Sequence, residues 1–252
     1  MNAIKEPLFF AIIAIIIFLF GGYIVLDWFQ FIRKIADYKH PEIPYVRATK
    51  VAVSFLAAIL VFIIGKDGFN ERDTIMLVIA YAIIFIGDLF LVFDINLIGI
   101  AVFASSHIFF ILRNGSGITR YIKDGSSINR LYDFVSALII IGVVFTVLWV
   151  FFYPRLEGNA FFYVLLGYGL FLGVSLWTAW AALRIGFMPG HNALLAAIGI
   201  TCFFISDLLV GVHFATEPGD TQLIARYTTW IFYTPALVLI ALSGYDLSKI
   251  FV

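Results

Sequence analysis

Long apolar runs separated by short polar segments make up most of this chain. A membrane-spanning helix needs about 20 largely apolar residues. Eight segments satisfy this requirement: residues 8–27, 46–64, 74–93, 97–113, 132–153, 160–184, 191–213 and 227–245. The segments between them hold most of the charged, Gly and Pro residues, which is typical of loops. The pattern predicts an all-α polytopic transmembrane helix bundle, with residues 1–252 forming a single transmembrane domain.

Composition supports a membrane protein and excludes several classes of partner. The chain is 63% hydrophobic and 13% charged, whereas soluble domains are about 25% charged. Because 16 basic residues balance 16 acidic ones, we expect no nucleic-acid partner and predict no protein partner. The single cysteine and the lack of a helical His pair at metal-binding spacing argue against a disulfide within the chain, a metal or another cofactor.

An even number of spans places both chain ends on one side of the membrane. Nine of the 16 basic residues fall on that side, and the positive-inside rule then favours cytoplasmic termini. We expect a multi-pass protein of a prokaryotic cell membrane or of the endoplasmic reticulum.

Two similar motifs place an aspartate inside an apolar run. FIGDLFLVF at residues 85–93 contains Asp88, and FISDLLVGV at residues 204–212 contains Asp207. The two spans run in the same direction, so we expect the aspartates at similar depth. A four-plus-four parallel repeat would produce this match, and chance similarity between apolar segments would also explain it. Repeat-built membrane proteins often bind their substrate between the repeats.

Asp88 and Asp207 are the candidate catalytic residues. A carboxylate at the bilayer centre costs roughly 2.5–3.5 kcal/mol, so such residues usually face the bundle interior and mark a site. Two carboxyls that approach each other in a buried site do not both ionise, which leaves an acid beside a carboxylate. Catalytic, proton-transporting and purely structural roles all remain open.

His107 and Lys50 are the basic side chains that could reach this pair. Gly99, Phe103 and His107 recur every four residues and so share one helical face. Lys50 lies near the start of its span. It either extends its ammonium group to the interface, meets an anionic headgroup, or holds one aspartate ionised.

Aromatic residues of the sixth and eighth spans are expected to line a cavity that opens sideways or toward one leaflet. Tyr233 stands out because Pro235, two residues later, frees backbone groups and could open the helix onto this cavity. The residues concerned are Tyr163, Tyr168, Trp177, Trp230 and Tyr233.

These motifs occur together, in order, over nearly the whole chain: Lys50, Gly87-Asp88, Gly99-x3-Phe103-x3-His107, Ser206-Asp207 and Tyr233. In this respect the chain resembles the YhhN-like family, the lysoplasmalogenases. Members of that family hydrolyse the vinyl ether bond of lysoplasmalogens and release a fatty aldehyde and a glycerophospho-headgroup. The resemblance implies a lysophospholipid substrate from the membrane and catalysis by Asp88 and Asp207. Lys50, His107, Tyr233 and Ser206 would then bind the substrate or tune the pKa values of the two aspartates.

Two positions depart from the family pattern. Phe110 stands where relatives carry a tyrosine three residues after the histidine, and Tyr233-Thr234-Pro235-Ala236 replaces Tyr-x-Ala-Gln. The missing glutamine puts the identity of the lysolipid in doubt.

Two other functions remain as alternatives. An intramembrane aspartyl protease also uses two aspartates and a Pro-Ala-Leu motif, present here as Pro235-Ala236-Leu237, but the Gly-x-Gly-Asp motif of those enzymes is absent. A proton-coupled carrier would titrate the same aspartates during transport and form no product.

Overall fold

The computed structural model describes residues 5–32, 44–124 and 126–246. Within these ranges, eight helices are long and apolar enough to cross a membrane. This confirms the predicted all-α bundle of eight spans, and the protein is a multi-pass integral membrane protein. The spanning helices are α1 (Lys5–Ile32), α2 (Pro44–Ile64), α3 (Glu71–Val92), α4 (Asn96–Asn114), α6 (Ser127–Val147), α8 (Ala160–Ile185), α9 (Gly190–Ala215) and α10 (Asp220–Leu242).

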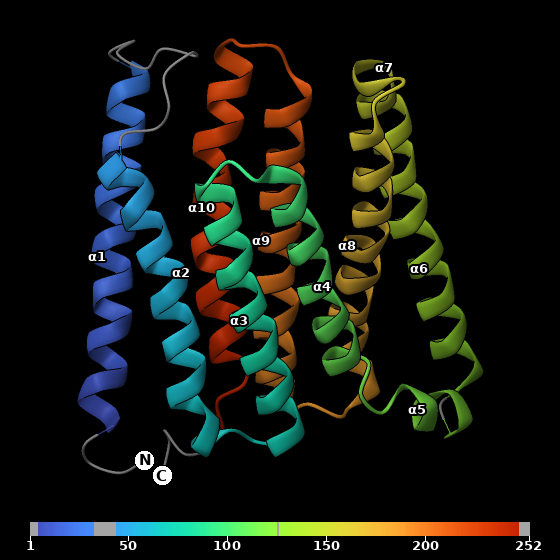
Figure 1. Cartoon of the computed structure of the whole chain (residues 1–252). Helices are drawn as coiled ribbons and strands as arrows, with labels where there is room; N and C mark the ends of the chain where they lie inside the picture. Colours follow the sequence, from blue (N-terminus) through green and yellow to red (C-terminus); the bar gives the residue numbers. More distant parts are fainter. Residues whose placement is uncertain (1–4, 33–43, 125, 247–252) are drawn as a thin grey trace.

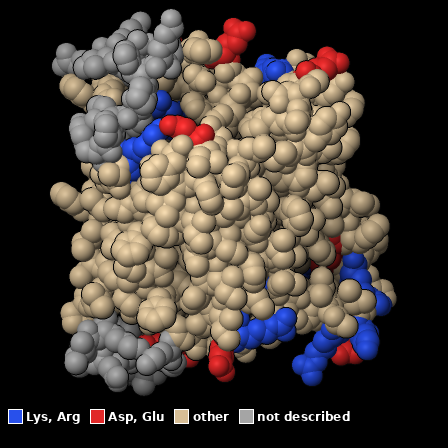
Figure 2. Space-filling view, viewed as in Figure 1, with Lys and Arg blue, Asp and Glu red and all other residues tan. Residues whose placement is uncertain are grey.

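Six of these helices form a closed ring. Each packs against the next in the order α2, α3, α4, α8, α9, α10, and α10 returns to α2. Outside the ring, α1 packs on α2 and α10, and α6 packs mainly on α8 (Figure 1). Figure 2 shows a broad band of uncharged side chains between charged residues at the two ends of the molecule. The neighbour order does not demonstrate an internal repeat, so the four-plus-four repeat stays a prediction.

Several helix ends differ from the predicted spans. The first span was predicted to end at residue 27, but α1 continues past Asp27 to Ile32. The predicted span ended at the charged residue because spans were predicted as apolar runs. A helix inside a membrane continues past a charge because its backbone groups have no water to which they can bond. The last helix begins earlier than predicted, at Asp220, and ends at Leu242. The polar segment before the fifth span also contains a short helix, α5 (Ile118–Asp124).

The fifth span is interrupted by one wide turn. After α6 comes a π-helical turn, η2 (Leu148–Phe152), followed by the short helix α7 (Tyr153–Leu156). Pro154 has no backbone N–H to donate to the carbonyl one α-turn earlier. The preceding residue, Tyr153, donates its backbone N–H to the Leu148 carbonyl instead, as a π-turn requires.

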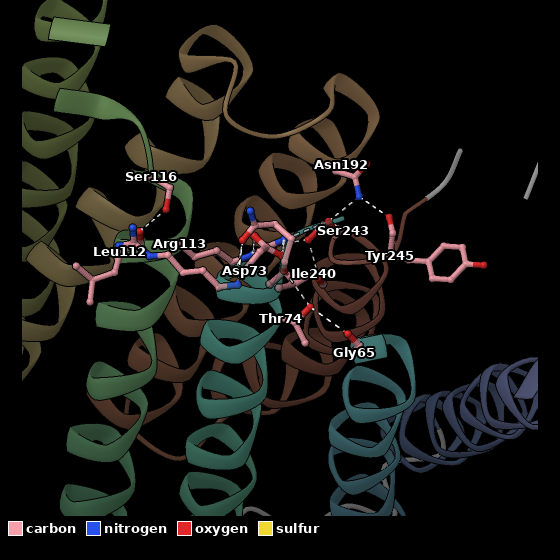
Figure 3. A network of polar contacts seen from close by, with 12 residues as sticks. Gly65, Asp73, Thr74, Leu112, Arg113, Ser116, Asn192, Ile240, Ser243 and Tyr245 are labelled. Atoms are coloured by element: carbon pink, nitrogen blue, oxygen red, sulfur yellow. Dashed lines mark hydrogen bonds and ion pairs between the residues drawn. The ribbon is translucent and has the colours of Figure 1, made fainter. Parts of the chain in front are cut away.

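A buried polar network holds one end of the bundle together (Figure 3). The Arg113 guanidinium on α4 donates to the Asp73 carboxylate on α3, at 2.7 and 3.0 Å, and to the Ser243 hydroxyl at 2.9 Å. Asn192 at the start of α9 donates to the carbonyls of Ser243 and Tyr245 at 2.8 and 2.6 Å. The network therefore links α3, α4 and α9 to the segment that follows α10.

The same end of the bundle holds the start of α1 and the end of α10 (Figure 1). The rings of Phe9 and Tyr245 stack there with their centres 5.8 Å apart. Cytoplasmic termini remain a prediction.

Candidate functional site

Asp88 on α3 and Asp207 on α9 line one cavity inside the helix ring, which we call the central cavity. Its volume is about 50 Å³, and a water molecule needs only about 10–15 Å³ of such space. The Asp88 residue is 5% exposed and the Asp207 side chain 9% exposed. The other lining residues are Leu91, Ile100, Phe103, Tyr168, Ser206, Val210, Thr229, Trp230 and Tyr233.

Asp88 is held from α10 and faces α2. The Tyr233 hydroxyl donates to its Oδ2 at 2.7 Å. Ser54 on α2 lies near both the Asp88 carboxyl and the Tyr233 hydroxyl but makes no hydrogen bond to either. Pro235 does not break α10, which runs without interruption past Tyr233 to Leu242. The tyrosine reaches the cavity by its position on the helix face and not through a local opening of the helix.

Asp207 is held from α8 and α4. The Tyr168 hydroxyl donates to its Oδ2, and His107 Nε2 lies 3.5 Å from the same oxygen. The fully buried His107 ring meets Phe203 edge-on, with ring centres 5.0 Å apart, which fixes its orientation. The structure therefore places His107 beside Asp207 and Tyr233 beside Asp88.

Several buried polar atoms around this pair have no hydrogen-bond partner among the described residues. They are the hydroxyl oxygens of Ser54 and Ser206 and both ring nitrogens of His107. Leaving a buried polar group unsatisfied costs about 1–3 kcal/mol, and native proteins bond most such groups to protein or to water. The two aspartates therefore lie among polar groups that have capacity for further hydrogen bonds.

Lys50 is buried and pairs with a residue that the sequence analysis missed. Its Nζ lies 2.8 Å from Asp27 Oδ2 on α1 and 4.9 Å from the centre of the Trp230 ring. Lys50 thus neither extends to the interface nor pairs with Asp88. Asp27 escaped notice because it fell at the end of the first predicted span, although an acidic residue inside a longer apolar run was a usable signal.

A second cavity, which we call the basic pocket, adjoins the central one. It has a volume of about 120 Å³ and shares Asp88, Leu91 and Trp230 with the central cavity. Its basic lining residues are Lys50 and Arg47, and the Arg47 guanidinium also donates to the Val92 carbonyl at 2.8 Å and to Asp94 at 3.2 Å.

A third cavity, which we call the apolar groove, lies between α6, α8 and α9. It has a volume of about 130 Å³ and shares Tyr168 and Asp207 with the central cavity. Asp207 therefore borders the central cavity on one side and the apolar groove on the other.

Three of the five expected aromatic residues lie at the central cavity: Tyr168, Trp230 and Tyr233. Tyr163 is 68% exposed on the outside of α8. The Trp177 indole donates to the Asp133 backbone carbonyl in a separate polar cluster. The hydrogen bond from Tyr168 to Asp207 was not predicted, since sequence spacing does not show which helix faces meet.

The model of the YhhN family matches residues 45–244, well over half of the chain. The chain belongs to the YhhN family. This family includes lysoplasmalogenases. Lys50, His107, both aspartates and Tyr233 lie inside the matched region of this YhhN protein, whereas Asp27 precedes it. No curated protein and no solved structure gave a significant match.

Proposed function

We propose that this YhhN family member is a lysoplasmalogenase, which hydrolyses the vinyl ether bond of a lysoplasmalogen to a fatty aldehyde and a glycerophospho-headgroup. The observation that carries the proposal is the pair of carboxyls, each held by a tyrosine hydroxyl, on one cavity inside the bundle that is large enough for water. Family membership supports the same reaction.

Vinyl ether hydrolysis needs an acid and a base in succession. The acid first gives its proton to the alkenyl carbon beta to the ether oxygen, which leaves an oxocarbenium ion at the carbon bonded to oxygen. The base then takes a proton from water as that water adds to the cation. The resulting hemiacetal splits into the aldehyde and the glycerol hydroxyl, and the proton gained by the base balances the proton lost by the acid. Glycosidases apply two carboxyls in the same way.

The hydrogen bonds suit Asp88 as the acid and Asp207 as the base. The Tyr168 hydroxyl donates to Asp207 Oδ2, and His107 Nε2 lies 3.5 Å from the same oxygen. These polar neighbours suit an ionised carboxylate, which is purely an acceptor. Asp88 accepts the Tyr233 bond through Oδ2, so its Oδ1 is suited to carry the proton that the alkenyl carbon receives.

The first test measures aldehyde release from purified protein by mass spectrometry, with lysoplasmalogen and with the corresponding acyl lysolipid. We expect aldehyde from lysoplasmalogen alone. Asp88→Asn and Asp207→Asn should each lower turnover by roughly 10²–10⁴-fold, because each removes an acid or a base, while both proteins stay monodisperse in detergent. Glu157→Gln, at an exposed loop position, is the control. Turnover near that of the wild type in either aspartate variant would contradict the proposal.

Azide separates the two roles in the same assay. In Asp207→Ala the oxocarbenium ion still forms, and azide attacks it without help from a base, so azide should raise substrate consumption. In Asp88→Ala the cation does not form, so azide should have no effect. If azide instead raised consumption only in Asp88→Ala, Asp207 would be the acid and Asp88 the base, and the proposed reaction would still stand.

The Pro-Ala-Leu segment is not at the site, which weighs against a protease. Ala236 and Leu237 are fully buried, and the Leu237 carbonyl accepts a hydrogen bond from Tyr81. Neither residue lines the central cavity. A proton-coupled carrier would show flux across vesicles and no aldehyde.

A further inference from the structure

The apolar groove is almost entirely hydrocarbon. Of its lining residues, Asp207 and Tyr168 alone have polar side chains, and both also border the central cavity. The remaining lining residues are Val143, Val144, Val147, Leu148, Phe152, Leu165, Gly169, Leu172, Phe204, Leu208 and Gly211. A ligand in the groove would thus meet a polar group at the point where the groove borders the central cavity.

Glycines and the π-turn shape the groove. A Cβ atom on Gly169 would lie 2.6 Å from Leu148, and one on Gly211 would lie 3.0 Å from the Phe152 ring. Side chains from the α6 and η2 segment therefore pack directly onto the backbones of α8 and α9. Leu148 and Phe152, the first and last residues of the π-turn, both line the groove, and π-turns occur frequently at functional sites.

The groove lies within the membrane. With a rise of 1.5 Å per residue, Gly211 and Phe204 lie about 6 and 17 Å below the end of α9 at Ala215. Val143 on the α6 side is exposed on the outer surface of the bundle. The hydrocarbon chain of a lipid from one leaflet can therefore enter between α6 and α9 without leaving apolar surroundings.

We propose that the hydrocarbon chain of a single-chain phospholipid lies in the apolar groove, with its ether end at Asp207 and its headgroup toward Arg47 and Lys50. The proposal rests on the proposed function and adds the direction in which the substrate binds. The three adjoining cavities hold, in order, an almost entirely apolar lining, two carboxyls, and the cations Lys50 and Arg47, which Asp27 and Asp94 hold in place beside Asp88. This order matches the chain, the vinyl ether and the phosphate of the lipid. A volume of about 130 Å³ is close to that of a cavity of about 150 Å³ known to hold one benzene, so the groove admits the first part of one chain.

Photo-crosslinking tests this placement without requiring turnover. The probe is an alkyl ether lysophosphatidylethanolamine, which has no vinyl ether to hydrolyse, with a diazirine near the ether end of its chain. The protein is irradiated with the probe in phosphatidylcholine vesicles, and labelled peptides are identified by mass spectrometry. We expect most of the label on the groove segments, residues 143–152 and 204–211.

A pair of variants on α6 sharpens the test. Val147 lines the groove, whereas Ile139 is 60% exposed on the same helix and is not a lining residue. Val147→Trp should lower labelling of residues 204–211 several-fold by filling the groove, and Ile139→Trp should leave it unchanged. If Val147→Trp does not fold, unmodified alkyl lysolipid is added to the wild type as a competitor. It should lower labelling of residues 204–211 in the same way.

Three outcomes would overturn the placement. The first is labelling found mainly on α1 and α2, and the second is labelling that Val147→Trp does not change. The third is equal labelling of the groove by a diacyl phosphatidylcholine that carries the same diazirine, because this would mean that bulk lipid fills the groove. Because the probe is not hydrolysed, loss of groove labelling with intact aldehyde release refutes this placement alone. Groove labelling without aldehyde release refutes the proposed reaction alone.

Discussion

Lys50 and Asp27 show at the residue scale how a charged pair is tolerated inside the bundle. Both side chains are 2% exposed, and their charged atoms lie 2.8 Å apart. Taking each charge out of water costs several kcal/mol, which a close opposite charge and further bonds offset. Trp230 adds a cation–π contact to the ammonium group. The same pair ties α1 to the ring of helices at α2.

We predict that Lys50→Met and Asp27→Asn each destabilise the protein by about 3–5 kcal/mol, because each removes the opposite charge that lies 2.8 Å from a buried ion. The double variant Lys50→Met/Asp27→Leu should regain most of that loss. Thermal unfolding of the detergent-solubilised protein measures the effect, with Lys123→Met at an exposed position of α5 as the control. Single variants as stable as the wild type would show that the pair does not hold α1 in place.

At the scale of elements, the contact between α3 and α4 positions one wall of the site. A Cβ atom on Gly87 would lie 2.9 Å from the Phe103 ring, and one on Gly99 would lie 2.8 Å from Leu91. The two glycines therefore let side chains of each helix rest on the backbone of the other. Phe103 and Leu91, which occupy these positions, both line the central cavity beside Asp88.

We predict that Gly99→Leu destabilises the protein by roughly 1–3 kcal/mol through overpacking and lowers aldehyde release, because it pushes α4 from α3. Gly142→Leu is the matched control, since a Cβ atom there meets nothing within 4 Å. That substitution should be neutral or stabilising, by up to about 1 kcal/mol, because glycine is a poor helix former. Equal effects of the two substitutions on unfolding temperature would mean that the close approach of α3 and α4 is not required.

At the scale of the whole molecule, the Arg113 network and the central cavity lie at different levels of the bundle. Asp73 is near the start of α3 and Asp88 near its end, so the network fixes helix positions at one end while the site lies toward the other. Within the network, Asn192 and Arg113 both bind the carbonyl of Ser243. The segment after α10 thus depends on residues from α4 and α9.

We predict that Asn192→Ala and Arg113→Met each speed hydrogen exchange at the amides of residues 244–246, because the segment loses the bonds that hold it. Arg184→Met removes the ion pair with Asp133 in a separate cluster and should leave exchange at these amides unchanged. Mass spectrometry of exchanged peptides from protein in detergent provides the measurement. Unchanged exchange in both network variants would show that packing alone holds the segment.

The number and type of the membrane-spanning elements followed from the sequence alone, whereas α5, the π-turn and α7 did not. Each apolar run of about 20 residues must satisfy its own backbone inside lipid, and a helix does so without help from its neighbours. The two aspartates could be predicted as candidate site residues for a related reason, since a carboxyl inside an apolar run is costly unless it faces a site. The YhhN resemblance rested on motifs that remain visible in one sequence.

The partners of the site residues were decided by the tertiary structure. Most of these helices are apolar on all sides, so periodicity does not show which face meets which neighbour. The bonds from Tyr168 to Asp207 and from Tyr233 to Asp88, and the pairing of Lys50 with Asp27, each join residues from different helices. They depend on the order of helices in the ring and on the rotation of each helix about its axis. Both are set by packing between residues far apart in the chain, as are the three adjoining cavities.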